Sequence, residues 1–389
     1  MPKVAIVAGD ASGDLYGSKL IGELRQLISD CDVWAAGGPH LKNAGAQLAA
    51  DLSQASAIGV VESLKVVPSL YLSFRKVLNQ LKKKKPDVLV LIDFGAFNRR
   101  LGLKARKAGI RTVYFIPPGS WRKSNKGAVN IAECADLFLT PFPWSAKELS
   151  EAGANAVYTG HPLMDIAKPS VAPRQFRLEM GLAEDAEYVA LLPGSRRTEI
   201  KYILPSMLGA AEIISDLQPG LHFIIAAAPA VSERVQKTAN KWRKGWRERI
   251  PLKIVENRTC DVLAGAKAAV VASGTATLEA AIIETPLVVI YRGSRLMILE
   301  RMLRPRILGK YIALPNILAE DSVCEELIGK EASSEAIAAE IVRLLRNHNL
   351  RSKKKCKLKE VKSMLGEPGA LRRTAEQIAS LLKPSANER

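Results

Sequence analysis

A loop near the start of the chain combines glycine, hydroxyl and acidic residues in the pattern of a ligand-binding turn. It reads Gly9-Asp10-Ala11-Ser12-Gly13-Asp14 and follows an aliphatic run at residues 4–8. Its glycines permit a tight turn and allow a ligand to approach the backbone N–H groups at the start of a helix. The loop is neither a G-x-G-x-x-G fingerprint nor a P-loop, so a simple tight turn is the competing interpretation.

Two loops in the second half of the chain suit a diphosphate. Residues 192–200 read LPGSRRTEI, in which glycine and serine at a helix start stand beside two arginines that can neutralise phosphate without a metal ion. Residues 273–279 read SGTATLE, whose hydroxyls can cap a helix and whose glutamate can accept hydrogen bonds from a ribose. Capped helices with exposed charges are the alternative for both loops. The candidate residues for binding this ligand are Gly194, Ser195, Arg196, Ser273, Gly274, Thr275, Thr277 and Glu279.

One aspartate is placed to move a proton. Asp93 ends the aliphatic run 88–92 and is followed by phenylalanines, so partial burial is expected to keep its pKa useful for a general base. A helix cap is the alternative role. Asp10 and Asp14 are weaker candidates because the positive end of a helix dipole lowers their basicity, and His161 fits a turn better.

Metal and cofactor sites are not expected. The five cysteines are scattered without a C-x-x-C pair, and the four histidines form no H-E-x-x-H. The segment Asp30-Cys31-Asp32 resembles a metal-binding D-x-D, but it precedes a strand and so lies at the wrong edge of a sheet. The chain is therefore expected to work without a metal ion or cofactor.

The composition is that of a folded protein with an anionic partner. Apolar residues make up 48% of the 389 residues, which excludes disorder of the whole chain. The net charge of +18 favours nucleic acid, anionic lipid or a phosphorylated substrate, although a solvated surface also explains it. With 5% aromatic residues and no helix-turn-helix, nucleic acid is not expected. No apolar run of ~20 residues and no signal peptide is found, which predicts a cytoplasmic protein.

Short aliphatic runs alternate with helical stretches twice along the chain. Uniformly aliphatic strands separated by helices indicate parallel sheets covered on both faces. A proline-marked linker at 162–173 divides the two series. We expect an α/β fold of two doubly wound, Rossmann-like domains that face a cleft, at residues 1–165 and 174–365.

A segment at 58–78 has the pattern of a membrane-contacting helix. Val66, Val67 and Leu72 are apolar residues expected on its exposed side, flanked by basic residues, as in interfacial helices. An ordinary amphipathic core helix is the alternative. The residues expected to face the core are Leu70, Tyr71, Phe74, Val77, Leu78 and Leu81.

Taken together, the motifs resemble the lipid-A-disaccharide synthase family of GT-B glycosyltransferases, from Val4 to about Leu382. The segments that carry the resemblance are 8–14, 37–39, 58–62, 92–93 with 97–98, 160–163, 192–200, 272–280 and 314–318. The resemblance implies an inverting, metal-independent transfer from UDP-2,3-diacylglucosamine to 2,3-diacylglucosamine 1-phosphate, at the inner face of the cell membrane. It also implies an essential aspartate at Asp93 and a C-terminal helix, 368–389, that packs back on the first domain. The residues expected on the acceptor side are Ser12, Gly13, Asp14 and Asn98.

Three departures from the family pattern lie in the first domain. Asp10 replaces a glutamate, Ala96 replaces an aspartate, and Gly119-Ser120-Trp121-Arg122-Lys123 replaces a segment rich in valine and tryptophan. They leave open a related transferase or GT-B epimerase with another acceptor, or a non-catalytic UDP-sugar-binding paralogue. The sequence does not indicate the oligomeric state.

Overall fold

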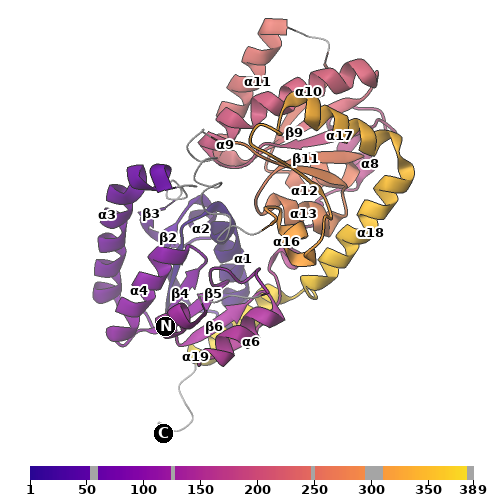
Figure 1. Ribbon diagram of the computed structural model, residues 1–389. Helices are drawn as coiled ribbons and strands as arrows, with labels where there is room; N and C mark the ends of the chain where they lie inside the picture. The colour runs from indigo at the N-terminus through magenta and orange to yellow at the C-terminus, as the bar shows by residue number, and fades with distance from the viewer. Residues whose placement is uncertain (53–59, 124–127, 247–249, 294–309, 383–389) are drawn as a thin grey trace. The chain divides into compact units, whose positions relative to one another are not determined.

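The computed structural model describes residues 1–52, 60–123, 128–246, 250–293 and 310–382 (Figure 1). The chain divides into two compact units. Unit 1 comprises Met1–Asp165 and Leu365–Arg389, and unit 2 comprises Ile166–Met364. Each unit is described by itself below.

Unit 1 is built on a seven-stranded parallel sheet with the strand order β3-β2-β1-β4-β5-β6-β7. The two central strands are aliphatic along most of their length and almost wholly buried, as expected for a sheet covered on both faces. The strands are β1 (Lys3–Ala8), β2 (Asp32–Gly37), β3 (Gln47–Asp51), β4 (Val88–Ile92), β5 (Arg111–Phe115), β6 (Leu137–Thr140) and β7 (Ala156–Tyr158).

Helices cover the sheet of unit 1, and the last helix of the chain is one of them. Helix α19 packs along α1, and its buried side chains include Leu371 and Ile378. Val77, Leu81 and Leu101, from α3 and α4, join a core cluster with the sheet. The helices are α1 (Ala11–Leu27), α2 (Pro39–Asn43), α3 (Val60–Lys84), α4 (Gly95–Lys107), α5 (Ala128–Ile131), η1 (Ala132–Cys134), α6 (Pro143–Glu151), α7 (Leu163–Ile166) and α19 (Ala370–Leu382).

Unit 2 repeats the architecture with a six-stranded parallel sheet in the order β10-β9-β8-β11-β12-β13. Its strands are β8 (Tyr188–Leu192), β9 (His222–Ala227), β10 (Leu252–Glu256), β11 (Ala268–Ala272), β12 (Leu287–Tyr291) and β13 (Glu325–Ile328). Its helices are α8 (Pro173–Glu179), α9 (Arg197–Tyr202), α10 (Leu204–Leu217), η2 (Pro229–Val231), α11 (Ser232–Trp246), α12 (Thr259–Gly265), α13 (Ala276–Ile283), α16 (Leu314–Ala319), α17 (Ser334–Arg346) and α18 (His348–Met364).

The predicted fold class, α/β with two doubly wound parallel sheets, is confirmed. Two strands were not anticipated, β3 and β13. Both lie at a sheet edge and are partly exposed, and their sequences, QLAAD and EELI, mix polar with apolar residues. Such edge strands lack the continuous aliphatic run by which the central strands are recognised.

Candidate active site

The loop after β1 and the residue after β4 emerge side by side from the sheet of unit 1. The two strands pair in parallel with Ala8 opposite Ile92, so Asp10 and Asp93 leave the same carboxyl edge of neighbouring strands. This is the edge at which ligands of doubly wound sheets bind.

The backbone at Asp93 has an unusual conformation that its neighbours hold in place. Asp93 has a φ of 42° and Phe94 a φ of 54°, two successive left-handed residues outside glycine. The Asp93 carbonyl accepts hydrogen bonds from Asn98 Nδ2 at 2.9 Å and from the Tyr114 hydroxyl at 2.8 Å. Its amide donates to the Phe115 carbonyl at 3.2 Å. Because such residues cost energy, they persist where surrounding contacts fix them, which is often at functional sites.

The carboxyl group of Asp93 is poised to exchange a proton near neutral pH. Burial, followed by the nearby Asp10 carboxylate, raises the pKa of Asp93 to about 7, and a hydrogen bond from the Phe94 backbone opposes both effects. A group with this pKa is about half deprotonated at pH 7, which is the range that suits a general base.

Gly9 leaves room for an aromatic ring next to this site. A Cβ atom added at Gly9 would lie 2.3 Å from atoms of the Phe94 ring, so no larger residue fits unless the ring moves. The Phe94 ring in turn packs against Phe97, with 5.0 Å between ring centroids. The glycine is therefore required by a steric contact, beyond the turn that its sequence context predicts.

The acidic residues of the first loop cap helices. Asp10 is the N-cap of α1 and accepts hydrogen bonds from the Gly13 amide at 2.9 Å and the Ser12 hydroxyl at 3.2 Å. The buried Asp14 carboxylate accepts from the amides of Gly38, His40 and Leu41 at 2.7, 2.8 and 3.2 Å. Asp14 thus fastens the start of α2 to α1, and a direct contact of Ser12, Gly13 or Asp14 with an acceptor stays a prediction.

Asn98 and His161 are buried residues of unit 1. The amide nitrogen of Asn98 donates to three carbonyls at the ends of β1 and β4, and its oxygen has no partner among the described residues. His161 packs edge-on against Tyr16, and its Nδ1 accepts from the Leu163 amide at 3.2 Å. Burial lowers the pKa of His161 to about 3, so the ring is neutral. Asn98 thus holds the backbone at the ends of β1 and β4, and its direct contact with an acceptor stays a prediction.

In unit 2, the loops proposed for the diphosphate also leave adjacent strands. Strands β8 and β11 pair with Leu192 opposite Val271, so the loop 193–196 and the loop 273–275 follow neighbouring strand ends. Both emerge at the carboxyl edge of the sheet, which is where an α/β fold binds nucleotides.

Glu199 occupies the first of these loops, a role that we did not anticipate. Its carboxylate accepts from the Ser195 and Arg196 amides at 2.9 and 3.1 Å and forms an ion pair with Arg196 Nη1 at 2.7 Å. Gly194 has a φ of 102°, and a Cβ there would lie 2.1 Å from a Glu199 oxygen. The spacing of a capping box at residues 196 and 199 was the signal for this contact. Arg196 Nε is buried and has no partner among the described residues.

The second loop is open where a ligand would need room. Among the residues that the structure describes, an added Cβ at Gly274 would meet no atom within 4 Å. The expected hydroxyl caps are wrong here. Ser273 Oγ donates to the Ile312 carbonyl at 3.1 Å, Thr277 Oγ1 donates to the Gly274 carbonyl at 2.7 Å, and Thr275 makes no cap hydrogen bond to α13. The hydroxyls of Ser273 and Thr277 bind carbonyls instead, and the first amides of the helix already donate to the carbonyls of Gly274 and Thr275.

Glu279 lies one turn into α13. Burial raises the pKa of its carboxyl group to about 7, and the carboxylate makes no hydrogen bond or ion pair with the described part of the chain. A carboxyl group in this state can accept hydrogen bonds from ligand hydroxyls without losing a partner in the protein.

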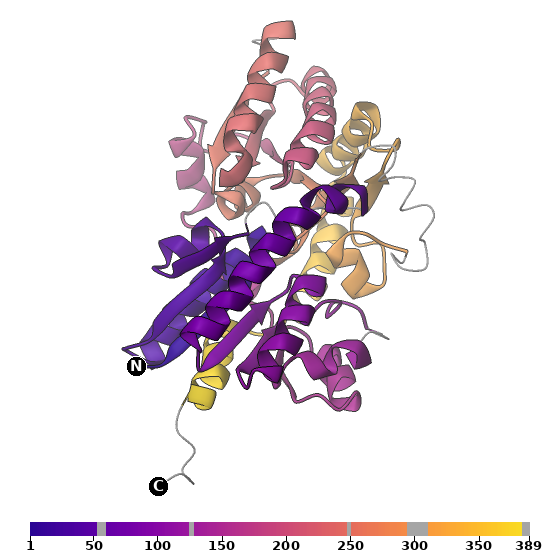
Figure 2. The ribbon, with the colours of Figure 1, turned by 90° about the vertical axis from the view of Figure 1, so that its left-hand side faces the viewer.

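Two of the apolar residues expected on the exposed side of α3 are indeed exposed. Val67 and Leu72 are 51% and 67% exposed, whereas Val77 and Leu81 are buried. The prediction that Tyr71 faces the core is wrong, because Tyr71 is 59% exposed and extends the apolar surface. The side chain of Val66 lies outside the described residues. Figure 2, which turns α3 toward the viewer, shows the helix running along the outer face of unit 1. Across the described ranges, we find no helix with the length and apolar character needed to cross a bilayer.

Comparison with known proteins places the chain in a family. The lipid-A-disaccharide synthetase family model matches residues 4–380. The chain is 34% identical to the lipid-A-disaccharide synthase of Trichlorobacter lovleyi over 383 residues, and 36% identical to that of Syntrophus aciditrophicus over 390 residues, with 98% of each chain covered in both cases.

Solved structures share the fold at low sequence identity. The UDP-GlcNAc 2-epimerase of Neisseria meningitidis, bound to UDP-GlcNAc, superposes with a TM-score of 0.65 at 12% identity, covering 97% of this chain and 100% of the other. MurG of Acinetobacter baumannii gives a TM-score of 0.57 at 14% identity, covering 98% and 100%. At these identities the likeness shows the GT-B fold alone. The match along nearly the whole sequence shows more: the chain belongs to the lipid-A-disaccharide synthase family, and it is a glycosyltransferase.

Proposed function

We propose that this glycosyltransferase joins UDP-2,3-diacylglucosamine to 2,3-diacylglucosamine 1-phosphate, forming the lipid A disaccharide and releasing UDP. Membership of the family supports the reaction class. The observation that carries the proposal is the Asp93 carboxyl group, whose pKa of about 7 and place at the strand edge suit a base that acts at neutral pH.

The proposed chemistry is a displacement with inversion at the anomeric carbon. The acceptor hydroxyl attacks from the face opposite UDP, the bond to the diphosphate breaks, and UDP leaves with the bonding electrons. Asp93 takes the proton that the hydroxyl loses as the new bond forms. Asn98 and Tyr114 support this step by holding the Asp93 backbone in its left-handed conformation. Burial, with help from Asp93, raises the pKa of Tyr114 well above its ordinary value, so its hydroxyl stays protonated and donates.

The donor is assigned to unit 2. Two observations support a diphosphate-binding site at the ends of β8 and β11. The buried Nε of Arg196 has no hydrogen-bond partner among the described residues, and the loop at Gly274 leaves room for a ligand. Arg196 is ion-paired with Glu199 through Nη1, but its Nε can still donate to a phosphate, and the amino end of α13 adds positive charge. These two groups are the basis for proposing a metal-independent reaction. Glu279 would accept hydrogen bonds from the ribose. The solved relatives bound to UDP or UDP-GlcNAc share this fold, which is consistent with a UDP-sugar donor.

The acceptor is assigned to unit 1, where this chain departs from its family. Asp10, Ala96 and the segment 119–123 differ from the usual pattern. Asp10 contributes to the raised pKa of Asp93, so this replacement bears on the proposed base. These differences favour, as a second candidate, a transferase that uses the same UDP-sugar with another glycolipid acceptor.

The proposed site of action is the inner face of the cell membrane, with the protein on the cytoplasmic side and attached peripherally. The exposed Val67, Tyr71 and Leu72 on α3 support apolar insertion, and the lysines at the end of this helix support attraction to anionic lipid. Sedimentation with anionic liposomes tests the attachment. A Val66→Ser/Val67→Ser/Leu72→Ser variant should bind less, and equal binding would contradict it.

The reaction is tested by incubating the purified protein with UDP-2,3-diacylglucosamine and a panel of acylated glucosamine acceptors. When 2,3-diacylglucosamine 1-phosphate is the acceptor, mass spectrometry should detect UDP and a disaccharide product. NMR should show that the configuration at the anomeric carbon of the donor sugar is inverted. Activity should persist in EDTA. Turnover only with another acceptor would favour the second candidate, and a requirement for Mg²⁺ would refute the metal-independent mechanism. The Asp93→Asn variant is the matched inactive control.

A further inference from the structure

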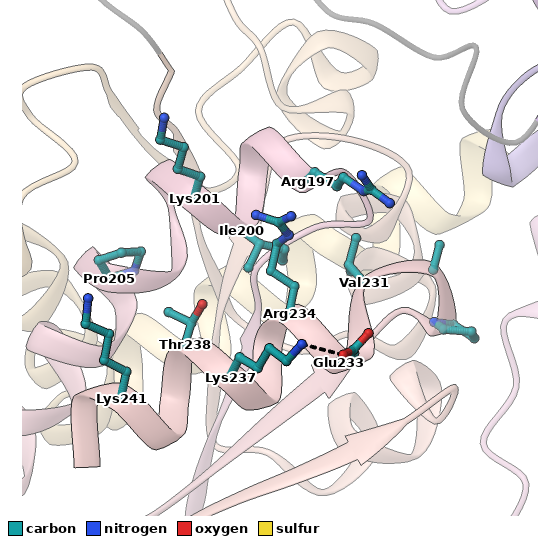
Figure 3. A pocket seen from close by; sticks show the side chains of 12 residues that line it. Arg197, Ile200, Lys201, Pro205, Val231, Glu233, Arg234, Lys237, Thr238 and Lys241 are labelled. Carbon is teal, nitrogen blue, oxygen red and sulfur yellow. Dashed lines mark hydrogen bonds and ion pairs between the residues drawn. The ribbon is translucent and has the colours of Figure 1, made fainter. Parts of the chain in front are cut away.

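A basic pocket lies in unit 2 beside the strand β9. It has a volume of about 730 Å³ and is formed by α9, the start of α10, η2 and α11 (Figure 3). The helices α9 and α11 follow β8 and β9, so the pocket lies on the β9 side of β8. The loops assigned to the donor lie on β8 and on its other neighbour, β11.

Five cationic side chains line the pocket against one acid. The cations are Arg197, Lys201, Arg234, Lys237 and Lys241, and all are exposed. The acid, Glu233, forms an ion pair with Lys237, as the dashed line in Figure 3 marks. Within the described part of the chain, the other four cations form no ion pair. Their mutual repulsion is therefore left for an anion from outside the protein to relieve.

The arrangement of the cations follows from the packing of the two helices. In α11, Val235 and Ala239 are fully buried against the core, which turns the positions of Arg234, Lys237 and Lys241 outward on one face. In α9, the buried Ile200 has the same effect on its neighbour Lys201. Because core packing fixes both helices, the two cationic rows face one pocket (Figure 3).

We propose that this pocket binds the phosphate of an anionic phospholipid headgroup. Charge complementarity is the argument: long, exposed cations suit a surface that carries many phosphates, where each basic residue adds a similar attraction. The pocket also exposes Pro205, Pro229 and Ala230 among the cations, the apolar component of an interfacial site. A site for one free phosphate ion would instead offer several directed donors with fixed geometry.

Vesicle binding of the full chain tests this proposal without any glycosyl substrate, so its outcome is independent of the proposed reaction. The test variant is Arg234→Gln/Lys237→Gln/Lys241→Gln, which keeps good helix formers at exposed positions. The control is Lys353→Gln/Lys355→Gln/Lys359→Gln on α18, which removes the same charge from exposed positions elsewhere in unit 2. Both variants are also made in a Val67→Ser/Leu72→Ser background, which separates the contribution of the pocket to vesicle binding from that of α3.

With phosphatidylglycerol vesicles, the test variant should lose about a hundredfold in partitioning, as three basic residues near an anionic surface imply, and the control should lose far less. The difference should vanish with phosphatidylcholine vesicles. Equal losses of vesicle binding in the test and control variants would mean that only the net charge of the protein matters, and would overturn the proposal. Titration with inorganic phosphate tests whether the pocket binds free phosphate instead of a headgroup. Saturable phosphate binding that only the test variant loses, together with unchanged vesicle binding, would assign a free-phosphate site and overturn the proposal.

Discussion

Replacement of Asp93 by asparagine is expected to stabilise unit 1 above neutral pH while it removes activity. The pKa of Asp93 is about 7 in the folded protein against an ordinary value of 3.8, a gap of about 3 units. At about 1.4 kcal/mol per unit, the ionised carboxylate costs the folded state up to about 4 kcal/mol. Asparagine removes this cost, tolerates the left-handed backbone at this position, and cannot accept the proton.

The pH dependence follows from the sign of the shift. Below about pH 4 the carboxyl group is protonated in both the folded and the unfolded states, so the substitution should change little. Between pH 4 and 7 only the folded state keeps the proton, so the free energy of unfolding of the wild type falls as the pH rises. Above pH 7 the loss is complete, and the advantage of Asp93→Asn should be largest.

Hydrogen exchange with mass spectrometry, read on β1 and β4 at pH 5 and pH 8, reports the opening of unit 1 separately from unit 2. Asp30→Asn, at an exposed aspartate, is the matched control and should show no such dependence. In parallel, turnover by Asp93→Asn should fall by ~10²–10⁴ with UDP affinity nearly unchanged. Equal protection of the β1 and β4 amides in the wild type and in Asp93→Asn at both pH values would refute the claim that the ionised Asp93 carboxylate destabilises unit 1. Turnover by Asp93→Asn near the wild-type rate would assign the role of general base to another residue.

Three further substitutions separate the parts of the site. Asp10→Asn should keep the cap of α1 but lower the pKa of Asp93, because it removes a like charge. The acidic limb of the pH–rate profile should therefore move to lower pH. An unchanged limb would contradict an electrostatic effect of Asp10 on Asp93. Arg196→Ala should weaken UDP binding by about 1.5–3 kcal/mol in calorimetry, the range for a charged hydrogen bond, and unchanged affinity would remove Arg196 from the donor site. Gly9→Ala should displace the Phe94 ring and lower kcat more than it changes UDP affinity; retained kcat would show that the ring can move freely.

The sequence was most informative where one segment determines its own structure. The buried central strands were recognisable because each contains an unbroken run of five apolar residues, at 4–8 and 88–92, and Asp93 stood out because it follows such a run. The contacts that hold Asp93 were not accessible in this way. Tyr114 reaches its carbonyl from a different strand, and a pattern along the chain carries no record of which strands become neighbours.

The second loop shows the same limit in another form. A serine–threonine-rich turn before a helix predicts hydroxyl caps, but Thr277 binds a carbonyl of its own loop. The local geometry of the turn decided between two partners that the composition allows equally. In the sequence, the only signal for Glu199 was its position three residues after Arg196, the spacing of a capping box. Its hydrogen bond with the Arg196 side chain depends on the conformation of the folded loop.

The return of the last helix to unit 1 has a consequence for biosynthesis. Helix α19 supplies Leu371, Ala375 and Ile378 to the surface that covers α1, yet these residues are the last part of the described chain to leave the ribosome. Unit 2 ends at Met364 and is complete before them. During synthesis the second unit is therefore complete first, and the first unit keeps an apolar face on α1 uncovered until residues 370–382 have emerged. A chain truncated before residue 370 would leave that face uncovered permanently, and exposed apolar surface of this kind makes a partly folded chain prone to aggregate.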